Sequence, residues 1–149
     1  MRRVIGVLVG LFLLVTVVAV GYDLTPADAV PPPPLDAAGH ELRTAGLSTH
    51  YEQWGTRGSA IVLVHGFLES AQVWSELGPR LAAMNHRVYA IDVRGYGYTQ
   101  RRGPYTLASD TDQLQGFLKA AGLTSDPAGL PLLVGHSSGA AIVGNLARL

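Results

Sequence analysis

A serine framed by two glycines is the residue of this chain whose surroundings most clearly suggest chemistry. Ser137 lies in the sequence LLVGHSSGAA, after an apolar run and before a stretch of small residues. A G-x-S-x-G turn between a strand and a helix holds the serine in a strained backbone conformation, and the glycines let the two elements approach closely. The pattern therefore predicts a nucleophile at a helix N-terminus, where backbone N–H groups favour a developing negative charge. A helix-capping serine in a glycine-rich turn is the alternative.

The second chemical motif is VHGFLES, residues 64–70. A serine nucleophile needs two backbone donors that converge on the oxyanion, and on such a turn one of them is the N–H of the following residue, Ser138. The other is expected from the loop after His65, with Phe67 N–H preferred and Leu68 N–H as the alternative. Gly66 permits the tight turn that directs this donor. His65 itself is expected to be a buried histidine at the end of a strand, with no direct chemistry.

Alternating strand and helix patterns surround both motifs. The predicted strands cover residues 47–55, 60–66, 87–95 and 130–135. The predicted helices cover residues 70–81, 107–123 and 137–149. Pro79 should kink or split the first helix. From Ile61 onward strands and helices alternate, which predicts an α/β fold with a mostly parallel sheet and helices on both faces.

Residues 51–149 resemble the N-terminal half of an α/β-hydrolase fold domain with a serine nucleophile. The stretches HGF, DVRGYG and GHSSG occur in the order and at the spacing of that family. The resemblance implies that Ser137 is the nucleophile and that the N–H groups of Phe67 and Ser138 form the oxyanion hole. It also implies residues that only shape the two motifs: His65, Gly66, Gly135, His136 and Gly139.

The family's D-x-R-G-x-G turn is matched by DVRGYG, which we interpret as structural. Its matching residues are Asp92, Arg94, Gly95 and Gly97. Tyr98 departs from the pattern, because the family commonly has a small serine there.

Serine at the nucleophile position restricts the chemistry that the resemblance implies. Haloalkane dehalogenases and epoxide hydrolases of the family have aspartate at this position, so we expect acyl transfer instead: attack on a carbonyl, an acyl-enzyme, then water. The substrate is then a small ester or similar acyl compound, and no cofactor or metal is expected. The alternatives are a non-catalytic binding module of the same fold and a cofactor-free, peroxidase-like hydrolase, which would use the same residues.

A general base and an acid for Ser137 are missing from the chain. In this family the order is serine, then aspartate or glutamate, then histidine, and residues 138–149 contain neither. No histidine before Ser137 occupies the family's position. The stretch 130–134 is apolar on both faces, which suits a central strand. We therefore expect residues 41–149 to be a partial domain that a C-terminal half completes; a split protein with a partner chain is the alternative.

The first residues suggest export. Arg2 and Arg3 precede an uncharged run that extends to Tyr22, which predicts a signal anchor, or a cleaved signal peptide, over residues 1–22. Residues 23–40 contain four consecutive prolines and read as an extended linker. The basic residues before the run place the hydrolase domain outside the cytoplasm, anchored to the membrane or secreted.

Composition excludes several classes of protein. Eleven basic residues balance eleven acidic ones without a basic stripe, so nucleic acid is not an expected partner. The absence of cysteine excludes disulfides, thiolate metal sites and a cysteine nucleophile.

Overall fold

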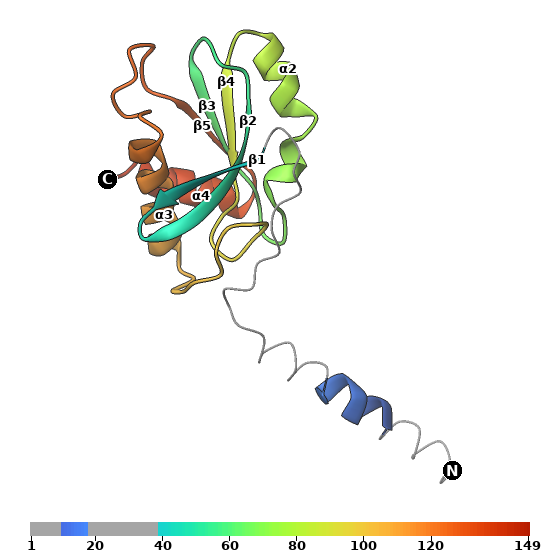
Figure 1. The fold of residues 1–149 in the computed structure, drawn as a ribbon. Coiled ribbons are helices and arrows are strands. Elements are labelled where there is room, and N and C mark those ends of the chain that lie inside the picture. The colour runs from blue at the N-terminus through green and yellow to red at the C-terminus, as the bar shows by residue number, and fades with distance from the viewer. Residues whose placement is uncertain (1–9, 18–38) are drawn as a thin grey trace.

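The computed structural model describes residues 10–17 and 39–149 of the chain. Residues 39–149 form a five-stranded sheet with helices on both faces (Figure 1). The strands are β1 (Gly39–Thr44), β2 (Leu47–Trp54), β3 (Ala60–Val64), β4 (Arg87–Ile91) and β5 (Leu132–Gly135). Their order across the sheet is β1-β2-β4-β3-β5, so β4 lies between two strands that precede it in the chain.

The sheet is mixed, which corrects the prediction of a mostly parallel one. β3 pairs in parallel with β4 and β5, as the alternation of strand and helix predicts. β1 and β2 form an antiparallel hairpin, and β2 pairs antiparallel with β4. The hairpin turn is only two residues, Ala45 and Gly46, both with positive φ, and strands joined by so short a turn must run antiparallel. The sequence does not predict β1, because GHELRT is polar and largely exposed.

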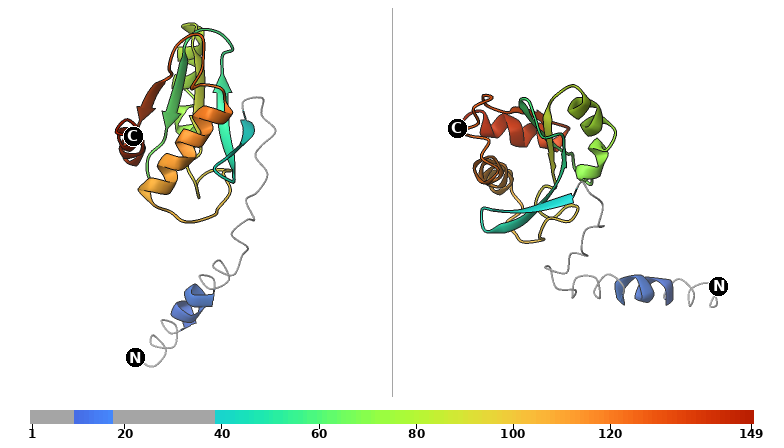
Figure 2. Two further views of the ribbon diagram at one scale, coloured as in Figure 1. Left: turned by 90° about the vertical axis from the view of Figure 1, so that its left-hand side faces the viewer. Right: turned by 45° about the horizontal axis from the view of Figure 1, so that its top comes forward.

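The helices follow the predicted order. The first helical segment is split, as Pro79 predicts, into a short 3-10 helix η1 (Ala71–Trp74) and α2 (Leu77–Ala83). α3 (Leu107–Ala120) begins with a capping box between Thr106 and Ser109 and ends before Gly122, which has φ +72°. α4 (Ser138–Leu146) follows β5 directly. Figure 2 shows α3 and α4 side by side on one face of the sheet and α2 on the other.

Two apolar clusters hold the helices against the sheet. On the face of α3 and α4, residues such as Val62 and Ile91 pack with Leu114 and Phe117. On the other face, alternate strand residues such as Leu63 pack around η1 and α2. β3 is buried along its whole length, as expected for a strand covered on both faces. This packing fixes the end of β3, from which the loop with the HGF motif leaves.

β5 lies at one edge of the sheet within residues 39–149, where it pairs with β3 alone. Leu132 is 60% exposed. An apolar strand with one unpaired edge accords with the expectation that the stretch 130–134 is a central strand of a larger sheet, which stays a prediction.

The N-terminal prediction is tested only in part. Residues 10–17 are helical, and their side chains are exposed. Among the residues described, no helix is long and apolar enough to span a membrane. Most of the anchor expected over residues 1–22 and of the linker expected over residues 23–40 lies outside the described residues.

Candidate active site

Ser137 lies on the sharp turn between β5 and α4. Its backbone has φ 52° and ψ −117°, a conformation that residues with a Cβ atom rarely adopt. The residue is exposed, and its side chain makes no capping hydrogen bond to α4. The structure therefore argues against the helix-capping alternative, since the hydroxyl is presented outward at the start of the helix.

Two glycines make this turn possible because backbone atoms occupy the space that a side chain would need. A methyl group on Gly135 would lie 2.5 Å from the nitrogen of Ala140, and one on Gly139 would lie 2.5 Å from the carbonyl oxygen of His65. Backbone at such distances cannot move aside without shifting the helix. These contacts place the first turn of α4 directly against β5 and the end of β3.

The loop after β3 lies against the turn that carries Ser137. A methyl group on Gly66 would lie 3.2 Å from Cβ of Ser137, so the two loops are nearly in contact. The backbone N–H groups of Phe67 and Ser138 donate no hydrogen bond within the described part of the chain. Both residues also line one cavity of about 620 Å³. The two expected oxyanion donors are thus unoccupied and border the same space.

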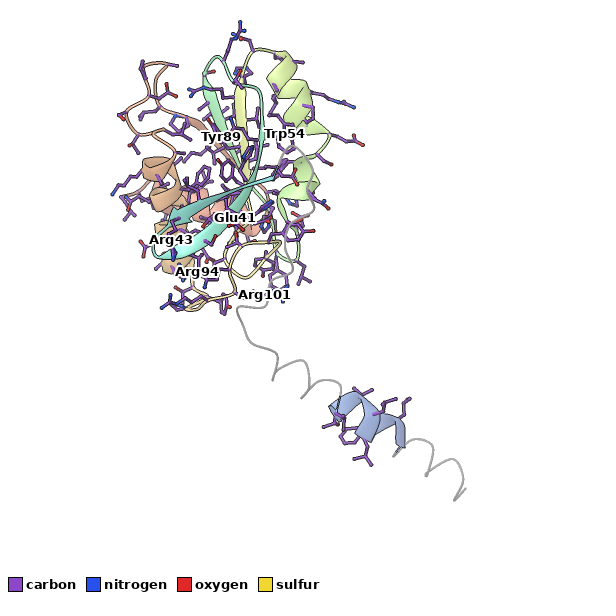
Figure 3. All side chains as sticks on the ribbon, viewed as in Figure 1. Glu41, Arg43, Trp54, Tyr89, Arg94 and Arg101 are labelled. Carbon is purple, nitrogen blue, oxygen red and sulfur yellow. The ribbon has the colours of Figure 1, made fainter. Side chains whose placement is uncertain are left out.

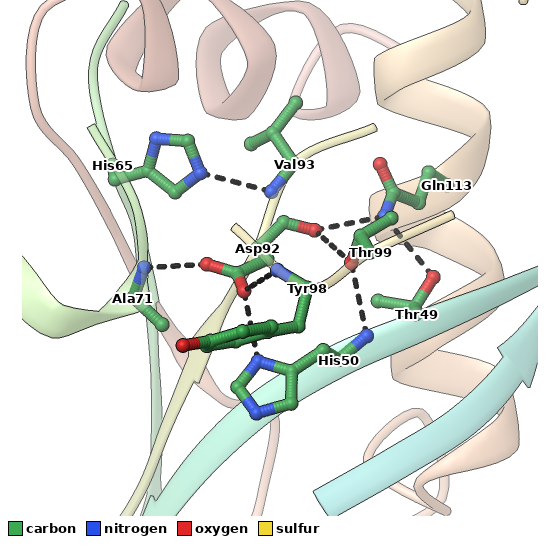
Figure 4. A network of polar contacts seen from close by, with 9 residues as sticks. All are labelled: Thr49, His50, His65, Ala71, Asp92, Val93, Tyr98, Thr99 and Gln113. Carbon is green, nitrogen blue, oxygen red and sulfur yellow. Dashed lines mark hydrogen bonds and ion pairs between the residues drawn. The ribbon is translucent and has the colours of Figure 1, made fainter. Parts of the chain in front are cut away.

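His65 holds this loop in place as a neutral imidazole. It is 1% exposed, and its Nε2 accepts the backbone N–H of Val93 at 2.9 Å (Figure 4). Its Nδ1 therefore carries a proton, which it donates to the carbonyl of Gly66 at 2.7 Å. Burial lowers the pKa of His65. Because both ring nitrogens are engaged, His65 has no free nitrogen to act as a base.

Glu69 joins the two motifs, and the sequence analysis missed it. One carboxylate oxygen, Oε2, accepts the backbone N–H of Gly66 at 2.7 Å and lies 3.0 Å from Nδ1 of His136, the residue before Ser137. His136 and the N–H of Gly66 together lower the pKa of Glu69. The carboxylate therefore connects the loop of Phe67 to the turn that carries Ser137 and Ser138.

Asp92 organises the neighbouring loops from a buried position. It is 1% exposed and accepts the backbone N–H of Ala71 at 2.6 Å and of Tyr98 at 2.8 Å, while Nδ1 of His50 lies 2.8 Å away (Figure 4). His50 is 3% exposed, with the ring of Tyr98 packed edge-on against it. This buried pair is structural, as expected for Asp92, and it shows where the unexpected Tyr98 is accommodated.

The described residues hold no group of three or more histidine, aspartate or glutamate side chains arranged to bind a metal ion. The arrangement presents the hydroxyl of Ser137 near two residues, Phe67 and Ser138, whose backbone N–H groups are free within the described part of the chain. Attack of a serine on a carbonyl requires donors of this kind for the developing oxyanion.

The comparisons define the class of protein. A model of the alpha/beta hydrolase fold matches residues 59–149, which include both motifs, the turn at Asp92 and all four helical segments of the domain. The chain therefore belongs to the alpha/beta hydrolase fold family, and the expected family is confirmed.

Individual relatives point to hydrolases in particular. Pig bifunctional epoxide hydrolase 2 is 31% identical over 134 residues, covering 85% of this chain and 23% of its own. The structure of an epoxide hydrolase from an endophytic Streptomyces matches with a TM-score of 0.66 at 33% identity, covering 74% of this chain and 33% of the other. A thioesterase domain from the curacin biosynthetic pathway matches with a TM-score of 0.64 at 27% identity, covering 75% and 42%. The chain thus spans less than half the length of each.

Proposed function

We propose that the protein is a serine hydrolase of esters or related acyl compounds, with Ser137 as the nucleophile. The observation that carries the proposal is the strained, exposed Ser137 beside the free N–H groups of Phe67 and Ser138. Strain of this kind persists only where the surrounding structure enforces it, and it is concentrated at functional sites.

The reaction proceeds in two halves. Ser137 Oγ attacks the substrate carbonyl, and the N–H groups of Phe67 and Ser138 stabilise the tetrahedral oxyanion. The alcohol leaves with the serine proton, an ester of Ser137 remains, and water hydrolyses it to the acid. The proton needs a base. His65 and His50 are engaged and buried, and His136 turns its Nδ1 to Glu69, so we assign the base and its acid to a complementing C-terminal half.

The relatives named as epoxide hydrolases raise the question of an epoxide substrate. Attack of Ser137 on an epoxide carbon would form an ether. An ether has no carbonyl for water to attack, so the enzyme would stop after one turnover. Attack on an acyl compound forms an ester, which water can cleave. The chemistry of serine therefore favours acyl substrates, and the thioesterase domain among the structural matches is consistent with them.

The test compares one nucleophile variant with a matched serine. When the protein is purified from the organism that produces it, a fluorophosphonate should label Ser137. Ser137→Ala should abolish this labelling and lower kcat for a 4-nitrophenyl ester about 10⁴- to 10⁶-fold. Ser75→Ala, at the exposed serine that follows η1, should change neither.

Four results would contradict the proposal or favour one of its alternatives. Equal labelling of the wild type and Ser137→Ala would show that Ser137 is not the nucleophile. Steady turnover of styrene oxide to its diol, without ester hydrolysis, would assign epoxide chemistry instead. Folded protein with no labelling and no turnover would favour a non-catalytic binding module, and perhydrolysis in acetate with peroxide would identify the peroxidase-like alternative.

We further propose that the domain is extracytoplasmic, either anchored in the membrane through residues 1–22 or secreted. Support comes from Arg2 and Arg3 before the uncharged run. Alkaline phosphatase fused after Leu149 should be active, and activity of only a cytoplasmic reporter at that position would reverse the topology.

A further inference from the structure

The cavity beside the oxyanion donors is large enough for a small organic substrate. Its volume is about 620 Å³, within the range of pockets that bind drug-sized ligands. It lies between the loop after β3, the segment from Val93 to Leu107, and the first turns of α4. Because Phe67 and Ser138 form part of its wall, a group bound in it adjoins the proposed site of attack.

Most of the wall is apolar. Three aromatic side chains contribute, and two of them are largely uncovered, since Phe67 is 66% and Tyr105 is 60% exposed. Tyr96 packs edge-on against Phe67, with ring centroids 6.2 Å apart. Leu107 and Ile142 close the wall with aliphatic groups. Such a wall binds the hydrocarbon or aromatic part of a ligand.

The charges in the same wall do not balance. Arg94 and Arg101 both line the cavity and lie at the same end of the domain (Figure 3), and Asp110 is the one acidic residue among the lining residues. Arg94 is 7% exposed and donates to the carbonyls of Arg102 and Ser109, but its buried Nε has no partner. Within the described residues Arg101 makes no hydrogen bond or ion pair.

Asp110 does not neutralise both cations. Its buried Oδ1 has no hydrogen-bond partner, and burial raises the pKa of the carboxyl group, although Arg94 acts in the opposite direction. Even fully ionised, one carboxylate leaves the pair of guanidinium groups with a net positive charge. A cation held at an apolar wall without a partner is a ready site for an anion.

We propose that the substrate is an anionic ester, with an apolar body and a carboxylate that Arg101 binds, assisted by Arg94. This inference rests on the proposed function and names its substrate class. Hydrolysis leaves the carboxylate unchanged: the ester bond breaks, water supplies one oxygen and two hydrogens, and an acid and an alcohol result. The carboxylate lies on either the acyl or the alcohol part, and the test separates the two.

The experiment uses pairs of esters matched in size. Mono-4-nitrophenyl adipate against 4-nitrophenyl hexanoate tests the acyl part, and 4-acetoxybenzoate against 4-methylphenyl acetate tests the alcohol part. We expect the purified full-length protein to prefer the anionic member of one pair in kcat/KM. Arg101→Gln should reduce that preference about 10- to 100-fold, the range of one charged hydrogen bond, by lowering kcat/KM for the anionic ester.

The control removes the same charge elsewhere. Arg57 is exposed in the turn before β3 and does not line the cavity, so Arg57→Gln should keep the preference. An anion preference that survives Arg101→Gln, or no preference in either pair while neutral esters are hydrolysed, would overturn the inference but leave the proposed function intact.

A binding measurement tests the inference even if the protein hydrolyses none of these esters. Calorimetric titration with benzoate should show binding that Arg101→Gln weakens and Arg57→Gln does not, whereas benzyl alcohol should bind alike to all three proteins. Equal affinity of benzoate for the wild type and Arg101→Gln would overturn the inference without reference to activity. Failure of the proposed function would give a different result, because none of the four esters would then be hydrolysed.

Discussion

Replacing Ser137, the proposed nucleophile, by glycine should stabilise the fold. Ser137 holds φ 52° and ψ −117°, where strain in a residue with a Cβ atom costs about 1–3 kcal/mol. Glycine relieves the strain, but it lowers the free energy of unfolding by about 0.5–1 kcal/mol because the unfolded chain gains conformational entropy. The exposed side chain makes no capping hydrogen bond, so its removal costs little. The net gain for Ser137→Gly is then about 0–2.5 kcal/mol, with a middle value of about 1 kcal/mol, which corresponds to about 4–8 °C in Tm for a domain of about 100 residues.

Urea unfolding followed by tryptophan fluorescence measures this difference, with two variants as controls. Ser137→Ala keeps the strain and should match the wild type, which separates the backbone effect from the loss of the hydroxyl. Ser75 has an ordinary helical φ of −59°, so Ser75→Gly should lower the free energy of unfolding by about 0.5–1 kcal/mol. If Ser137→Gly is no more stable than Ser137→Ala, the turn carries no strain and the argument from backbone geometry fails.

Three further outcomes follow from buried groups near the site. Asp92→Asn should lower the free energy of unfolding, measured in urea, by about 2–4 kcal/mol, because in either orientation of the amide its NH₂ group faces a buried backbone N–H. The control Asp112→Asn, at an exposed residue, should change the free energy of unfolding by no more than about 0.5 kcal/mol. Burial lowers the pKa of His65, so below pH 6.5 the unfolded chain binds a proton that the folded chain refuses. Stability should fall as pH decreases from 6.5, less steeply in His65→Gln, and equal slopes would refute this. Gly139→Ala should lower the stability of the fold in thermal unfolding by about 3 kcal/mol or more. Gly144 lies on the same helix with open space around it, so Gly144→Ala should raise the stability by about 0.5–1 kcal/mol. Similar effects at both glycines would contradict the close packing at Gly139.

The parts of the fold that the sequence predicts are those written in local patterns. Short apolar runs mark β3 and β4 because both strands are buried on two faces, and Pro79 marks the break between η1 and α2. The two motifs are equally local, since glycine spacing reports the backbone of the turn at Ser137 directly.

The parts that it does not predict depend on distant partners. The polar β1 is recognisable only through its pairing with β2, and the position of β4 between β2 and β3 is a property of the whole sheet. Glu69 and His136 are 67 positions apart, and His50 and Asp92 are 42 apart. Their types suggest ion pairs, but no local pattern names the partner, because the crossovers of the chain bring these side chains together.

The turn at Ser137 divides its residues into two kinds with opposite tolerance to substitution. At Gly135 and Gly139 the backbone of other segments fills the available space, so no larger residue fits. The serine side chain points outward, and the fold does not depend on its contacts. The side chain at position 137 is therefore the part of this turn that the surrounding packing constrains least. Similarity of the scaffold to an epoxide hydrolase does not specify which residue lies at this position, so the fold is a weaker guide to the chemistry than this single side chain.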